Sequence, residues 1–244
     1  MRSVGIIAMI SLAGTFAQAQ IVTNVIDSFT TAQTLSVVSG YGTSTIAAAG
    51  AIGGYRTFTL NVANTDEEPV TLISSTNSRR LNLNSPTGAT ADFTVTWGGL
   101  GGTNGLGGVD LLGGNPTASQ SSLKFNLRST DWPSTFTWSF TDTLSQTATY
   151  SGTFPQHAAT SPQVAYDIAL TSFTGSINWK SINFITLSGG GVAELDLSLS
   201  ALNVPLSIQT TAMAPVPEPG TWAAAALLAG VAGFIHWRRR RVDA

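Results

Sequence analysis

Apolar and polar residues alternate with a period of two in several segments, and this alternation limits the possible folds more than any other feature. In residues 56–64, Phe58, Leu60 and Val62 fall on one face, with threonine and asparagine on the other. The same alternation recurs in residues 91–97, 121–129, 135–141 and 193–202. A period of two indicates strands with one buried face, and Gly, Asn and Pro between the segments indicate short connections.

These patterns predict an all-β fold, a single antiparallel β-sandwich with jelly-roll-like topology. No segment between Gln20 and Thr211 has a helical period, so we expect about ten to fourteen strands in two packed sheets. Because a sandwich buries one face of each strand, the alternation also predicts a set of buried side chains. These are Phe58, Leu60, Val95, Phe125, Trp138 and Leu197.

The composition fits a folded protein and excludes some functions. Only 10% of the 244 residues are charged, which is the opposite of a disordered composition. The chain has no cysteine, which excludes disulfides and thiolate metal sites. Residues 20–216 hold six basic and eleven acidic residues, a net charge of −5. We therefore expect no binding to the phosphate backbone of a nucleic acid.

The N-terminus has the pattern of a signal peptide, predicted as a helix. Arg2 precedes an apolar run, and Ala17 and Ala19 are the small residues of a cleavage site before Gln20. We expect the mature chain to begin at Gln20 and to be exported.

The C-terminus has the pattern of a membrane anchor. Trp222 to Trp237 is a run of 16 residues, apolar except for His236. As a helix it spans about 24 Å, slightly less than the ~30 Å hydrocarbon core of a bilayer. The two tryptophans are placed at the interfaces, and an arginine cluster keeps the far end cytoplasmic. This cluster is Arg238, Arg239, Arg240 and Arg241.

A Pro-Glu-Pro motif, a short apolar helix and terminal arginines occur together in residues 216–241. This combination resembles the PEP-CTERM sorting signal of bacterial envelope proteins. The resemblance implies cleavage near Pro217, Glu218 and Pro219 by an exosortase, a membrane-embedded transpeptidase-like enzyme, for which these are substrate residues. Prolines disfavour helix and fix an extended backbone that an enzyme can grip.

The predicted organisation has four parts: a signal peptide (1–19), a β-sandwich domain (20–212), a linker with the Pro-Glu-Pro motif (213–221) and a transmembrane sorting helix (222–241). We expect an exported, single-pass intermediate in the inner membrane. From there the protein passes to the cell envelope, the outer surface or the extracellular matrix.

The stretch from Trp97 to Asn115 contains nine glycines. It lacks the Gly-Lys-Ser/Thr ending of a phosphate loop and a dinucleotide fingerprint before a helix, so nucleotide binding is not expected. We predict a glycine-permitted loop from a strand ending at Trp97 to a short strand at residues 109–112. Asp110 either binds a cation beside glycine carbonyls or caps a turn.

Side chains suited to catalysis are scarce. A Ser-His-Asp triad would have to form around His157, and no nucleophile-elbow motif supports one. Paired carboxylates for glycoside hydrolysis remain an option among the acidic residues. The acidic turn Asp66–Glu68 either holds Ca²⁺ or, as we favour, is part of a solvated hairpin. We expect no enzymatic activity, no cofactor and no bound metal.

Two patterns bear on ligand binding. Phe136, Trp138 and Phe140 form a stripe that either packs in the core, as we favour, or stacks on sugar rings. Paired threonines resemble ice-binding faces, but without a fixed repeat they equally fit any solvent face of a sheet. These pairs are Thr57/Thr59, Thr94/Thr96 and Thr135/Thr137.

Two function classes follow. The first is a non-enzymatic envelope or matrix protein, sorted through its tail, with exopolysaccharide as a candidate partner. The alternative is a sandwich that binds or cleaves carbohydrate. An exposed aromatic platform or two carboxylates in one cleft would favour the alternative, and buried tryptophans would favour the first.

Overall fold

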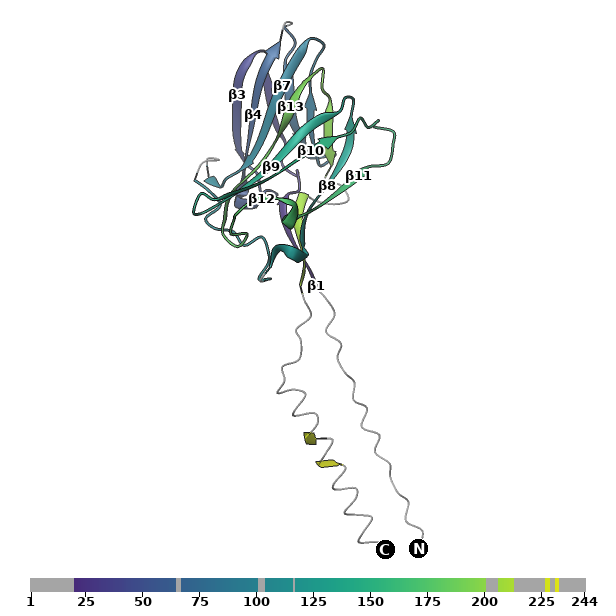
Figure 1. Ribbon diagram of the computed structural model, residues 1–244. Helices are drawn as coiled ribbons and strands as arrows, with labels where there is room; N and C mark the ends of the chain where they lie inside the picture. Colours follow the sequence, from purple (N-terminus) through teal and green to yellow (C-terminus); the bar gives the residue numbers. More distant parts are fainter. Residues whose placement is uncertain are drawn as a thin grey trace, which may run out of the picture. The chain divides into compact units, whose positions relative to one another are not determined.

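The computed structural model describes residues 20–64, 67–100, 104–115, 117–200 and 206–212, with 227–228 and 231–232 in the tail. Ile21–Ala212 form one compact unit. Within the described residues this unit is built from β-strands in two sheets, and every pairing with a defined register is antiparallel (Figure 1). The predicted all-β, sandwich-like architecture is confirmed.

One layer, the β8 sheet, has the strand order β1-β15-β8-β14-β6-β5-β2, and β11 also pairs with β8. β14 and β15 pair with successive parts of one edge of β8, and β11 pairs with the other edge. Its strands are β1 (Gln20–Asp27), β2 (Gln33–Val37), β5 (Val70–Ser75), β6 (Arg80–Asn84), β8 (Ser121–Thr130), β11 (Val164–Ala169), β14 (Leu197–Ser200) and β15 (Leu206–Ala212).

The other layer, the β13 sheet, has the order β12-β10-β9-β13-β7-β4-β3. Its strands are β3 (Gly40–Ala47), β4 (Tyr55–Asn64), β7 (Ala89–Trp97), β9 (Ser134–Asp142), β10 (Thr147–Phe154), β12 (Thr174–Gly175) and β13 (Ile182–Ala193). Short 3-10 turns lie at η1 (Ile52–Gly54), η3 (Ala118–Gln120) and η4 (Leu170–Ser172).

The alternation in the sequence forms the core between the sheets. All the side chains predicted to be buried are at most 4% exposed, so that prediction is confirmed. Burying an aliphatic or aromatic side chain of this size contributes about 1.5–3 kcal/mol. The polar side of the same strands consequently faces solvent on the outside of each sheet.

Three details of the predicted strand pattern are wrong. The described residues contain 15 strands, one more than the upper expectation, and β12 is only two residues long. Residues 193–202 do not form one strand, because the chain turns at Glu194, whose φ of 58° lies in the left-handed region. Residues 109–112 are not a strand, since only Val109 makes an isolated bridge, to Ile182.

Candidate functional site

The residues predicted for export and sorting lie outside the described part of the chain. They are Ala17, Ala19, Pro217, Glu218, Pro219, Trp222, Trp237, Arg238, Arg239, Arg240 and Arg241. Gln20, predicted as the first mature residue, is the first residue of β1. Within the described ranges, no helix combines the length and apolar character needed to span a membrane.

The aromatic stripe on β9 belongs to the core. Phe136, Trp138 and Phe140 are at most 1% exposed. Trp138 stacks on Trp97 with ring centroids 5.9 Å apart, and Phe136 stacks on Phe154 at 4.2 Å. The favoured core interpretation is confirmed, and this stripe offers no surface to a sugar ring.

Asp110 caps a turn, which confirms one of the two interpretations of this residue. Its Oδ1 accepts a hydrogen bond from the backbone N–H of Leu112 at 2.8 Å, and Oδ2 accepts one from Gly114 at 3.1 Å. Gly113 and Gly114 have φ values of 58° and 86°, which explains why glycines occupy this turn. Both carboxylate oxygens therefore already have backbone donors.

The acidic segment does not lie in a hairpin. β4 belongs to the β13 sheet and β5 to the β8 sheet, so the segment between them crosses from one layer to the other. A hairpin requires two neighbouring strands of one sheet, so our favoured interpretation was wrong. Asp66 lies outside the described residues, while Glu67 and Glu68 are exposed. Among the described residues, no three His, Asp or Glu side chains are grouped to hold a metal ion.

His157 lies beside Thr130, and their backbones exchange two hydrogen bonds of 2.7 and 2.9 Å. Its Nε2 is buried and has no hydrogen-bond partner among the described residues. A catalytic histidine of a triad needs a hydrogen bond to the nucleophile and another to an orienting carboxylate. Among the described residues, the His157 side chain makes neither of these two hydrogen bonds.

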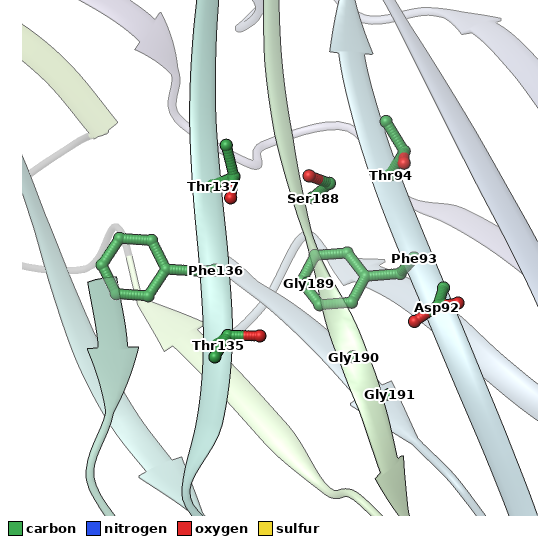
Figure 2. Close-up of a pocket in the computed structure, with 10 residues that line it drawn as sticks. All are labelled: Asp92, Phe93, Thr94, Thr135, Phe136, Thr137, Ser188, Gly189, Gly190 and Gly191. Atoms are coloured by element: carbon green, nitrogen blue, oxygen red, sulfur yellow. The ribbon is translucent and has the colours of Figure 1, made fainter. Parts of the chain in front are cut away.

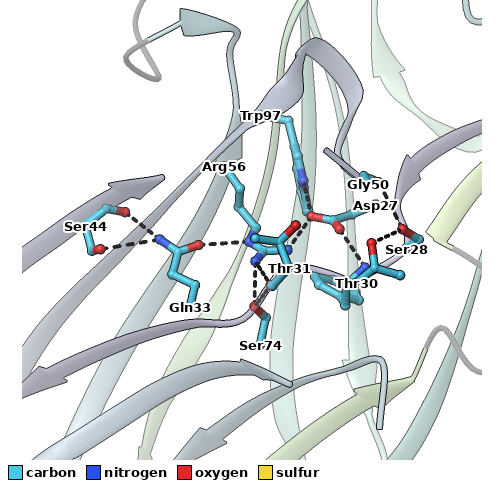
Figure 3. A network of polar contacts seen from close by, with 11 residues as sticks. Asp27, Ser28, Thr30, Thr31, Gln33, Ser44, Gly50, Arg56, Ser74 and Trp97 are labelled. Atoms are coloured by element: carbon cyan, nitrogen blue, oxygen red, sulfur yellow. Dashed lines mark hydrogen bonds and ion pairs between the residues drawn. The ribbon is translucent and has the colours of Figure 1, made fainter. Parts of the chain in front are cut away.

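A buried ion pair that the sequence analysis did not predict joins the two sheets (Figure 3). Arg56 on β4 is fully buried, and its Nη1 lies 2.8 Å from Oδ2 of Asp27 at the end of β1. Its Nε donates to Oε1 of Gln33 at 2.9 Å. Its Nη2 donates to the carbonyl of Thr31 at 2.8 Å and to the hydroxyl of Ser74 at 2.5 Å.

The carboxylate of Asp27 has further donors. Trp97 Nε1 donates to Oδ2 at 2.8 Å, and the Phe29 amide donates to Oδ1 at 2.7 Å. Burial raises the pKa of Asp27, against the opposing effects of Arg56 and of these donors. The guanidinium carbon also lies 5.4 Å and 5.0 Å from the ring centroids of Phe29 and Phe58. The network is closed to solvent and links strands of both layers, so its role is structural.

A groove lies on the outer side of the β13 sheet (Figure 2). Its floor is Ser188–Gly191 of β13, and its walls are residues 92–94 of β7 and 135–137 of β9. It encloses about 310 Å³. The groove exists because Gly190, which pairs with Asp92 and Thr135 on the outer side of the sheet, has no side chain to fill the space between the two neighbouring strands.

Packing requires two of these glycines, Gly189 and Gly190. A Cβ at Gly189 would lie 2.9 Å from the carbonyl oxygen of Thr135 and 3.0 Å from the Phe93 ring. Gly190 has a φ of 125°, and a Cβ there would lie 2.1 Å from the Ala91 carbonyl oxygen. The register of β13 against β7 shifts just beyond, as in a β-bulge. Glycine inside a strand often marks such a bulge or a close approach by a ligand, and this run is the signal that the sequence analysis missed.

The walls of this glycine groove are polar. The side chains of Thr94, Thr137 and Ser188 are partly exposed, and those of Asp92 and Thr135 are exposed. Hydroxyl groups both donate and accept hydrogen bonds, and Asp92 adds an acceptor. General acid–base hydrolysis of glycosides needs two carboxyl groups, and the lining contains one. The arrangement is suited to binding.

Residues 215–241 match the PEP-CTERM protein-sorting motif. The chain therefore carries this motif, consistent with a substrate of an exosortase. A motif of this kind implies export and a membrane-anchored passage through the C-terminal tail. The match is confined to the tail and does not extend into the sandwich. No curated protein matches the chain.

Solved structures show only a distant likeness to the chain. The family 11 carbohydrate-binding module of the cellulosomal cellulase Lic26A-Cel5E of Clostridium thermocellum has 9% identity and a TM-score of 0.35, over 79% of this chain and 96% of the module. TmCBM61, solved with β-1,4-galactotriose, has 9% identity and a TM-score of 0.33, over 72% and 90%. The agarase AgWH50C has 12% identity and a TM-score of 0.40, over 62% and 24%. These values carry no argument about ligand or activity.

Proposed function

We propose that this protein is a non-enzymatic component of the cell envelope or extracellular matrix, delivered through its C-terminal tail. An exosortase-type enzyme acts on the tail near Pro217, Glu218 and Pro219. Before that step the chain passes through the inner membrane as a single-span intermediate, held by the predicted helix of residues 222–241. The N-terminal signal peptide is removed after Ala19, and a jelly-roll-like sandwich remains.

The observation that carries this proposal is the sorting motif at residues 215–241. Two features of the sandwich support a non-catalytic role. Its aromatic stripe is used for core packing, and its buried ion pair is fully engaged in joining the sheets. The sparse charge of the chain fits a protein that functions among neutral polymers.

A second candidate function, carbohydrate binding, is favoured by one observation. The glycine groove is open, polar and lined by hydroxyl groups together with one carboxylate. Such a lining can exchange hydrogen bonds with a sugar. The two candidates are compatible, since a matrix protein can be retained by the polysaccharide around it.

The sorting proposal is tested by replacing Pro217, Glu218 and Pro219 with alanine in a host that has the matching enzyme. Insertion depends on apolar length and terminal arginines, so the variant should still insert. It should persist as a full-length membrane species, while the parent becomes shorter and leaves the inner membrane. Mass spectrometry and membrane fractionation measure both.

Pro215→Ala is the matched control, because it removes a nearby proline and leaves Pro217, Glu218 and Pro219 in place. It should be processed like the parent. Equal processing of the triple-alanine variant and the parent would contradict the sorting proposal and leave an ordinary single-span anchor.

A further inference from the structure

The outer side of the β13 sheet carries complete rows of hydroxyl residues, aligned across neighbouring strands by the pairing register. One row crosses every strand of the sheet: Thr45, Thr57, Thr96, Thr186, Ser139, Thr149 and Thr174. The next row crosses all but β12: Thr43, Thr59, Thr94, Ser188, Thr137 and Ser151. We name these two rows the hydroxyl face. The glycine groove adjoins this face, because Thr94, Ser188 and Thr137 of the second row also line the groove.

The hydroxyl face is nearly free of charge. Neither row contains an ionisable side chain, and in the adjoining row Asp92 is the only carboxylate. That row consists of Tyr41, Asn61, Asp92, Gly190, Thr135 and Thr153. A well-designed soluble surface has charged residues at about 25–35% of its positions. A surface without charge does not attract a polyanion or a cationic peptide, and it matches a neutral polymer.

Many hydroxyl groups on this face are available for a ligand. Those of Thr45 and Thr57 bond to each other at 2.8 Å, and those of Thr137 and Ser151 at 2.9 Å. Other hydroxyls make no hydrogen bond to any described residue: Thr59, Thr94, Thr96, Ser139, Thr149, Thr186 and Ser188. Threonine has a stiff χ1 angle, so its hydroxyl is already positioned and little rotamer freedom is lost when a ligand binds.

The geometry favours an extended flexible polymer over a flat crystal. Neighbouring strands lie about 4.8 Å apart, so hydroxyls recur at short intervals across the whole sheet. A twist of about 20–25° between neighbouring strands turns the rows progressively, and no flat lattice plane such as ice can follow it. A polysaccharide chain can bend along the rows and exchange hydrogen bonds with several hydroxyls in succession.

We propose that the hydroxyl face, together with the adjoining glycine groove, binds a neutral polysaccharide. The polymer hydroxyls exchange hydrogen bonds with Thr94, Ser188 and Thr137, and the glycines let the chain approach the backbone of β13. Each hydrogen bond adds little, so affinity grows with the number of sugar units in contact. This inference deepens the proposed matrix role by naming a ligand class, and it does not depend on how the tail is processed.

The test is native affinity electrophoresis of the full-length chain in a detergent without sugar headgroups. The gels contain a soluble glucan, a galactan or a mannan, with alginate as the charged comparison. At least one neutral polymer should retard the chain, and alginate should not. Retardation by none of the neutral polymers, or by alginate alone, would overturn the proposal.

A paired substitution localises the binding. Thr94→Val with Thr137→Val removes two hydroxyls and keeps the β-branched shape, and should weaken binding about tenfold, as expected for two lost hydrogen bonds. Thr34→Val, at an exposed position on β2 in the β8 sheet, is the matched control and should leave binding unchanged. If the paired variant and Thr34→Val lose the same amount of binding affinity, the assignment of binding to the hydroxyl face is refuted.

If the paired substitution alters the near-ultraviolet circular dichroism spectrum, Ser188→Ala is used as the second variant. It should weaken binding several-fold, and unchanged binding would count against the groove as part of the binding site. Inhibition of ice recrystallisation by the chain, lost in the paired variant, would also overturn the proposal in favour of an ice surface. Normal tail processing together with absent polymer binding would refute this inference alone and leave the sorting proposal standing.

Discussion

Removing either charge of the Asp27–Arg56 pair should destabilise the sandwich at least as much as removing both, so the two losses should not add. Asp27→Asn leaves a fully buried guanidinium without its counter-ion, and Arg56→Met leaves a buried carboxylate without its cation. Breaking a buried ion pair in this way costs about 3–5 kcal/mol. For a domain of this size that corresponds to a fall in Tm of about 6–20 °C.

The double variant separates the pair energy from the rest of the network. It leaves no unpaired charge at this site, and asparagine still offers an acceptor to the Trp97 indole N–H or the Phe29 amide. It loses the bonds that Arg56 makes to Gln33, to Ser74 and to the Thr31 carbonyl. At about 1 kcal/mol for each such bond, the double variant should lose about 3 kcal/mol. Since the two single losses sum to about 6–10 kcal/mol, the cycle should show a coupling energy of about 3 kcal/mol or more.

Urea unfolding of the full-length chain in micelles, followed by near-ultraviolet circular dichroism, measures each free energy of unfolding. That signal reports on the packing of Trp97 and Trp138, which are stacked in the core. This prediction would be refuted if the losses in the free energy of unfolding of the two single variants simply added up in the double variant. It would also be refuted if each single variant lost less than about 1 kcal/mol, as is typical of an ion pair on the surface.

Two further predictions concern carboxylates that hold turns. Burial acts to raise the pKa of Asp142, but the N–H groups of Asn178, Gln146 and Leu144 outweigh it and lower the pKa below its ordinary value of 3.8. Because its pKa is lowered in the folded state, the ionised Asp142 carboxylate stabilises the fold at pH values above its unfolded pKa. This stabilisation is lost as the pH falls through its folded pKa. Asp142→Asn should therefore have a lower urea midpoint than the parent at neutral pH. The difference between the two midpoints should become smaller below about pH 4, and a difference that does not change with pH would contradict this prediction. Asp110→Ala should cost about 1–2 kcal/mol through the loss of two backbone hydrogen bonds. Added Ca²⁺ should not shift the parent's urea midpoint, and an upward shift would restore the cation interpretation.

The core could be predicted from the sequence because its signal is local. An alternation such as that of Phe58, Leu60 and Val62 needs only the period of a strand to assign the buried face. Arg56 lies on the same face two residues earlier, and its inward position follows from the same alternation. Its partner Asp27 could not be named, since the pair depends on which distant strands come together.

The hydroxyl face shows the same limit. The pairs Thr57/Thr59, Thr94/Thr96 and Thr135/Thr137 are visible in the sequence, and each alone fits any solvent-facing strand. All of them except Thr135, which falls in the adjoining row, join the two continuous rows only through the register of β4, β7, β13 and β9. That register links residues far apart in the chain. The acidic segment after β4 was misassigned for a related reason, because local turn chemistry does not reveal whether the chain stays in one sheet or crosses to the other.

The glycines of β13 connect the core to the outer surface and determine which substitutions can test binding. Gly189 faces the core, where the Phe93 ring fills the space that a side chain would need. Gly190 faces outward, but a Cβ there would collide with the Ala91 carbonyl. Filling the groove from its floor would therefore disturb the packing and pairing of β13 together with any ligand contact. The hydroxyls on the walls have no such role in the core, so wall substitutions can separate binding from folding.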